Sequence, residues 1–150
     1  MEEKKQTFRE SLAISQEEFT EMGRVGAMFF EQGNLHKART IFEGLVEMDP
    51  GSAEAHSALG AILTLNQQDQ EAIVHLERAI EIDREEIAPY VNIAEIFVRQ
   101  RRLEEAVAYL EKAIELDPEQ TDPAANRARM IVLGIYRVIK LDNGQITTNH

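Results

Sequence analysis

The sequence repeats itself at an interval of 34 residues. Three similar segments each close on an aspartate, at Asp49, Asp83 and Asp117. An alanine recurs at the same interval, at Ala38, Ala72 and Ala106. A period of this length predicts a stack of repeated units, because a single unit cannot bury its own apolar face and must pack against the next one.

Each unit carries two stretches with the periodicity of a helix. In the first unit, apolar or small residues recur three or four positions apart, at Met22, Val25, Gly26 and Phe29 and then at Leu35, Ala38, Phe42 and Leu45. Each unit is therefore predicted to be a helical hairpin. The small residues at Gly26, Gly60 and Ala94 lie inside predicted helices, where glycine costs about 1 kcal/mol relative to alanine. A close approach of the two helices would account for them.

This pattern resembles the tetratricopeptide repeat. Small residues stand at all three positions where that family favours glycine, alanine follows in each unit, and Pro50 and Pro118 close two of the units. Three residues depart from the pattern: Leu45 replaces an alanine, His56 replaces a large apolar residue, and Arg84 replaces a proline. The resemblance implies an all-α fold, an α-solenoid of three helical hairpins with a short N-terminal helix and a C-terminal capping helix.

The predicted organisation is one domain over 1–150. Its parts are repeats at about 19–52, 53–86 and 87–120, a capping helix at about 122–140, a short helix within 7–14 and a mobile tail at 145–150. Ser15 with Glu18 forms a predicted capping box, and the other predicted helix starts are Asn34, Asp69 and Asp122. Asn143 and Gly144 are predicted to end the last helix.

Composition narrows the function. Residues 1–120 carry 12 Lys and Arg against 25 Asp and Glu, and so acidic a body repels phosphate backbones and makes nucleic acid an unfavourable partner. We expect the arginines and the lysine of 121–150 to complement this acidic charge. The chain has no cysteine, and neither a signal peptide nor a stretch long enough to span a bilayer is recognised, so a cytoplasmic protein without membrane insertion is predicted.

The sequence indicates no catalytic chemistry. No nucleophile, base and orienting group can be assembled, and no phosphate-binding loop is present, so the chain is predicted not to be an enzyme and to need no cofactor. No metal site is predicted from the four histidines. A metal held by His56 and His75 is the minor alternative to ordinary histidines on helix faces.

A peptide-binding groove is the predicted site. In the resembled family the first helices of the hairpins line a concave groove, and the corresponding positions here are mostly small or apolar: Thr20, Ala27, Phe30, Ser57, Ala61, Thr64, Val91, Glu95 and Val98. Such a lining favours an extended polypeptide with apolar anchors. Relatives that bind the acidic tails of heat-shock chaperones use basic and amide side chains here. This chain has Gly23, Ala27, Ala58, Ala88 and Asn92 instead, so that clamp is absent.

A narrower resemblance points to the class II chaperones of bacterial type III secretion, which hold translocator proteins. It depends on short matches such as Gln32-Gly33, 42–45, 59–61 and 88–90. The competing hypothesis is a structural scaffold or assembly subunit that uses its convex face or its ends. A homodimer through the N-terminal segment around Phe8 and Leu12 belongs to that alternative.

Overall fold

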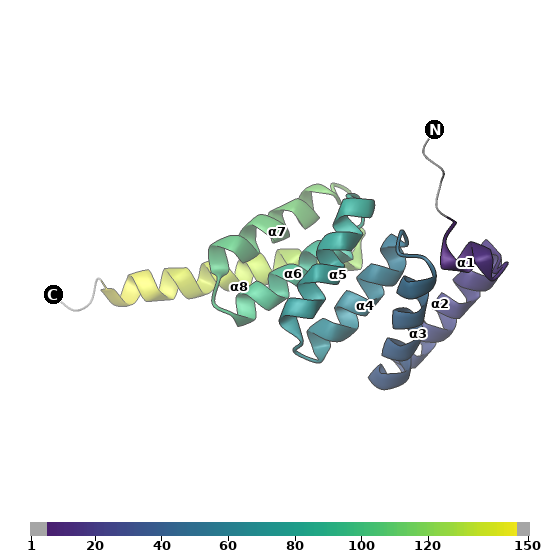
Figure 1. Cartoon of the computed structure of the whole chain (residues 1–150). Coiled ribbons are helices and arrows are strands. Elements are labelled where there is room, and N and C mark those ends of the chain that lie inside the picture. Colours follow the sequence, from purple (N-terminus) through teal and green to yellow (C-terminus); the bar gives the residue numbers. More distant parts are fainter. Residues whose placement is uncertain (1–5, 147–150) are drawn as a thin grey trace. The chain divides into compact units, whose positions relative to one another are not determined.

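The computed structural model describes residues 6–146, which form eight helices and no strand (Figure 1). The chain divides into two compact units, Met1–Pro89 and Tyr90–His150. The predicted all-α repeat fold with three helical hairpins is confirmed. The single domain over 1–150 remains a prediction, and residues 147–150 of the predicted tail lie outside the described residues.

The first unit contains two hairpins and a short leading helix. Its helices are α1 (Phe8–Ser11), α2 (Gln16–Glu31), α3 (Leu35–Met48), α4 (Ala53–Leu65) and α5 (Asp69–Ile82). Helix α2 packs against α3, α4 packs against α5, and α3 also packs against α4 (Figure 1). Each hairpin turns through a left-handed residue, Gly33 at φ 74° and Gln67 at φ 57°.

The helix starts show which capping predictions hold. Ser15 accepts a hydrogen bond from the Glu18 amide while the Glu18 carboxylate accepts one from the Ser15 amide, so the predicted capping box is present. Asn34 caps α3 as predicted. The prediction for Asp69 is wrong, because Asp69 is the first helical residue and Gln68 occupies the cap without a side-chain bond. An aspartate in a first turn still suits the helix dipole.

Two of the helical glycines, Gly26 and Gly60, lie where helices cross closely. A Cβ atom on Gly26 would lie 2.8 Å from Cε2 of Phe42, and one on Gly60 would lie 2.5 Å from Cγ of Leu76. The predicted close approach is therefore present, and a Cβ atom on Gly60 would also lie 3.4 Å from the carbonyl oxygen of Ala72. Real Cβ atoms are not found at 2.5 or 2.8 Å from another group, so glycine is required unless Phe42 or Leu76 moves.

The second unit contains the third hairpin and the last helix. Helices α6 (Ala88–Arg99, whose first two residues precede the unit boundary), α7 (Leu103–Glu115) and α8 (Pro123–Ile146) compose it. Asp122 accepts bonds from the amides of Ala124 and Ala125 and starts α8 as predicted. The predicted end is wrong, since α8 continues through Asn143 and Gly144. Gly144 does not have the left-handed backbone that would end a helix there.

Candidate functional site

A small apolar hollow on the first unit brings together three of the predicted groove residues. Ala27 and Phe30 of α2 and Ala61 of α4 line it, with Phe42 and Ala58 completing its wall. Its volume is about 130 Å³. The space exists because alanines face it from both first helices, and Phe42 closes its base. The hollow can accept an apolar group, because no polar side chain lines it.

Three other predicted positions of this unit lie outside that hollow. Thr20 is exposed and borders a separate, very small recess with Gly23 and Phe19. Ser57 and Thr64 are buried, and the Thr64 hydroxyl donates to the Gly60 carbonyl oxygen at 2.8 Å. Because this bond is internal to α4, Thr64 has little left to offer a ligand.

Ser57 is engaged with a partly buried carboxyl group. Its hydroxyl hydrogen-bonds Glu86, which lies just before α6. Burial raises the pKa of Glu86, and the nearby carboxylates of Asp83 and Glu54 raise it further, whereas the bond from Ser57 opposes the shift. Ser57 and Glu86 therefore form a polar pair that is hydrogen-bonded within the chain.

In the second unit the predicted positions are largely occupied by the chain itself. Val91 is fully buried, and Glu95 forms an ion pair with Arg127 of α8 at 2.8 Å. Arg127 also donates to the side-chain oxygen of Asn92 at 3.1 Å. Val98 alone borders open space, a hollow of about 350 Å³ whose other walls come from Arg101, Leu103 and α8.

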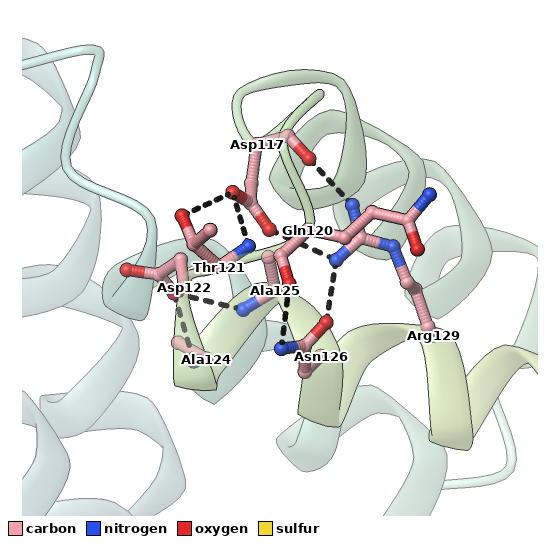
Figure 2. Close-up of polar contacts among 8 residues, drawn as sticks. All are labelled: Asp117, Gln120, Thr121, Asp122, Ala124, Ala125, Asn126 and Arg129. Carbon is pink, nitrogen blue, oxygen red and sulfur yellow. Dashed lines mark hydrogen bonds and ion pairs between the residues drawn. The ribbon is translucent and has the colours of Figure 1, made fainter.

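A partly buried ion pair anchors α8 to the turn that follows α7 (Figure 2). One Arg129 nitrogen donates to the Asp117 carboxylate at 2.9 Å and another to the Asp117 carbonyl oxygen at 2.6 Å. Asp117 is 5% exposed, and the bond from Arg129 holds the pKa of its carboxyl below the usual range. Two of the basic residues near the C-terminus, Arg127 and Arg129, thus pair with acidic residues as predicted. Arg137 and Lys140 form no ion pair with any other residue in 6–146.

Two features were missed or only partly anticipated by reasoning from the sequence alone. The first is a larger hollow of about 390 Å³ on the opposite edge of the first hairpin, lined by Met22, Val25, Thr40, Ile41, Gly44 and Met48. The periodicity that identified Met22 and Val25 as packing residues could have indicated it, since both side chains remain more than a third exposed. The second is a direct contact between the rings of His56 and His75. No group of three or more potential metal ligands occurs within 6–146.

Family models described as tetratricopeptide repeat match residues 24–52 and 51–119. A curated relative, the peroxisomal targeting signal receptor of Komagataella phaffii, is 31% identical over 71 residues. The match covers 47% of this chain and 12% of the receptor's length. None of the helices described in 6–146 combines the length and the apolar character needed to cross a membrane.

Solved structures with the same fold include the type III secretion translocator chaperone SycD of Yersinia enterocolitica. It has a TM-score of 0.76 and 20% identity, covering 86% of this chain and 98% of SycD. SycD in complex with a peptide of the translocator YopD has a TM-score of 0.73 and 22% identity, covering 87% and 98%. The first repeat domain of Spaghetti bound to the HSP90 peptide SRMEEVD has a TM-score of 0.69 and 19% identity, covering 82% and 97%. At these identities the likeness establishes the fold.

Proposed function

Because the chain belongs to the tetratricopeptide repeat family, we propose that it is a non-catalytic module that binds an extended polypeptide segment. The observation that carries this proposal is the apolar hollow lined by Ala27, Phe30, Phe42, Ala58 and Ala61. Its volume of about 130 Å³ is close to that of an engineered cavity of about 150 Å³ that holds benzene. One aliphatic or small aromatic side chain of a ligand would fit.

The physics of the hollow favours an apolar anchor over a charged one. A carboxylate or ammonium group placed there would lose water without gaining a partner, which is strongly unfavourable. The positions that would form a carboxylate clamp are Gly23, Ala27, Ala58, Ala88 and Asn92, none of which carries a positive charge. An acidic C-terminal peptide such as SRMEEVD is therefore a poorer candidate ligand than an apolar segment.

The narrower version of the proposal is a chaperone for a translocator of type III secretion, acting in the cytoplasm. Its support is the likeness to SycD over nearly the whole of that chaperone and the complex of SycD with a translocator peptide. The apolar hollow disfavours the acidic HSP90 peptide held by Spaghetti. The chaperone version thus rests on a shared fold and on a hollow that suits an apolar ligand.

A titration with two peptides tests the proposal. We expect the full chain to bind the YopD peptide at least about tenfold more tightly than SRMEEVD, a difference of ~1.4 kcal/mol. Ala61→Glu should abolish this preference, because the new carboxylate enters the hollow. Val74→Glu is the matched control, since Val74 is 65% exposed and outside the hollow. Equal binding of both peptides, or undiminished binding by Ala61→Glu, would refute the proposed site.

One observation favours assembly as a second candidate function. The hollow lined by Met22, Val25, Ile41 and Met48 leaves apolar side chains of the first hairpin open, and Phe8 and Leu12 in the segment ahead of it are about half exposed. A homodimer that uses this edge would cover them. Sedimentation velocity of the chain and of Val25→Glu tests this candidate, because a dimer that depends on the edge should dissociate in the variant. A chain that is monomeric at all concentrations would argue against it.

A further inference from the structure

One pair of corresponding positions in the helical hairpin is occupied by different side chains in the three repeats. Shifting by 34 residues aligns three pairs, Met22 with Ile41, His56 with His75, and Tyr90 with Tyr109. Each pair joins the first helix of a hairpin to the second. The first pair lines one apolar hollow, the tyrosine rings lie with centroids 6.4 Å apart, and the histidine rings lie 5.3 Å apart. Only the second repeat fills this position with groups that titrate near neutral pH.

The hydrogen bonds of the histidine pair restrict where its protons can lie. His56 is 6% exposed, and its Nε2 lies 2.9 Å from the Pro50 carbonyl oxygen, an acceptor only, so Nε2 carries a hydrogen. The Nδ1 atoms of His56 and His75 lie 3.0 Å apart. In the neutral pair His56 Nδ1 must therefore accept, and His75 Nδ1 donates.

This arrangement tolerates one additional proton but not two. A proton on His75 Nε2 leaves the bond between the Nδ1 atoms in place, although it puts a charge in a partly buried site. A second proton could go only to His56 Nδ1, which would place two N–H groups against each other 3.0 Å apart. The hydrogen bond would be lost, and two positive rings would be held in contact.

The charged groups around His75 do not remove this conflict. Glu71 lies one turn earlier on α5 and Glu43 projects from α3, and both favour a charged His75. Arg39 of α3 already pairs with both carboxylates, at 2.5 Å to Glu43 and 3.6 Å to Glu71. From α4, the group that faces His75 is His56. The two carboxylates are thus shared with a permanent cation, which limits their attraction for an imidazolium.

We propose that the contact between His56 and His75 is a proton-sensitive joint that loosens the second hairpin as the solution becomes mildly acidic. The joint connects α4, α5 and the turn at Pro50 that follows α3. Loss of these hydrogen bonds would weaken the packing of α4 against both α3 and α5.

The pKa of His75 moves in the direction that the joint requires. Burial lowers this pKa below its usual value, and the neighbouring His56 lowers it further against the opposing effect of Glu71 and Glu43. The unfolded chain therefore binds the proton more readily than the folded one. The stability that this histidine contributes is fully present above the usual histidine pKa, about 6.5. It is lost as the pH falls below that value towards the lowered pKa of the folded state.

Equilibrium unfolding of the full chain in urea between pH 7.5 and pH 5 tests the joint. Because the folded state binds the proton of His75 less readily than the unfolded state, the folded-to-unfolded ratio should fall several-fold between pH 7.5 and pH 5. The double variant His56→Met with His75→Ile, which installs the pair of the first repeat, should lose this component. His36→Gln, a change of an exposed histidine, should behave as the unaltered chain does. Parallel pH profiles for the chain and the double variant would overturn the proposal.

Two further measurements keep the test decisive if the double variant does not fold. His75→Gln can still donate to His56 Nδ1 but cannot titrate, so it too should show a flatter pH profile than the unaltered chain. In NMR spectra of the unaltered chain, the Cε1 proton of His75 should titrate below the usual histidine pKa of about 6.5. Titration of His75 at or above that value, or an unchanged profile for His75→Gln, would show that the pair is only a packing contact.

Discussion

The first helices of the first two repeats, α2 and α4, have the same apolar pattern but very different surroundings. Met22 and His56 occupy the same position of the repeat and are 39% and 6% exposed. Val25 and Leu59 also correspond and are 38% and 2% exposed. Helix α4 is covered by α3 on one side and by α5 on the other, whereas α2 packs mainly against α3. The difference therefore comes from the neighbours of each helix and not from its own pattern.

The comparison shows that apolar side chains stay uncovered at the edge of the first repeat. Within 6–15, the part of the segment ahead of α2 that the structure describes, the one helix is the four-residue α1. Its Arg9 lies over the Phe19 ring at 5.1 Å and pairs with Asp49 at 3.5 Å. These contacts secure one end of the hairpin and leave Met22 and Val25 open. The apolar hollow at this edge corresponds to the position that α3 fills for the next repeat.

The strongest test of this contrast truncates corresponding side chains. Leu59→Ala should destabilise the chain by about 2 to 5 kcal/mol, because it leaves a cavity in a fully packed site. Val25→Ala removes less apolar surface from a partly exposed site and should cost less than about 1 kcal/mol. Urea unfolding of both variants measures the two losses. Similar losses would mean that the edge of the first hairpin is covered in solution, by a second copy or by the N-terminal residues.

A second test uses two glycines with opposite surroundings. Gly60→Ala should be destabilising, because its Cβ would meet the fully buried Leu76 and overpacking costs about 1 to 3 kcal/mol, partly offset by about 1 kcal/mol of helix propensity. Gly44→Ala is the control, since no atom lies within 4 Å of a Cβ there. It should stabilise α3 by about 0.5 to 1 kcal/mol. Thermal unfolding compares the two, and a stabilising Gly60→Ala would contradict the close crossing of α4 and α5.

The fold could be predicted in detail because the repeat presents the same evidence three times. The 34-residue period identified the hairpins, and local chemistry identified the starts at Ser15, Asn34 and Asp122. The two boundary errors, at Asp69 and at Asn143 with Gly144, fall where a residue type permits a cap but the backbone does not adopt one. A capping residue indicates that a helix can begin or end at that position, whereas packing determines where the helix does begin or end.

Only part of the candidate site could be predicted from the sequence. The family geometry named nine positions, and three of them, Ala27, Phe30 and Ala61, share one hollow. Other predicted positions already make polar contacts within the chain; Glu95, for example, pairs with Arg127. Such pairings depend on distances between segments far apart in the sequence, and no periodicity contains them. The contact of His56 with His75 was weighed only as a metal site, because the sequence does not show which ring nitrogens face each other.

The smallest expected effect concerns the turns that close the first two hairpins. Gly33 and Gln67 have the same left-handed backbone, which costs a residue with a Cβ atom about 1 to 2 kcal/mol, whereas ordering a glycine costs roughly 0.5 to 1 kcal/mol more than ordering alanine. Gln67→Gly should therefore stabilise the chain by a few tenths to about 1 kcal/mol. Gly33→Ala should destabilise it by a similar amount, through backbone strain alone, because no atom lies within 4 Å of a Cβ at Gly33. If urea unfolding showed that Gln67→Gly weakens the chain as much as a glycine in a helix interior, the second turn would not have the same backbone as the first.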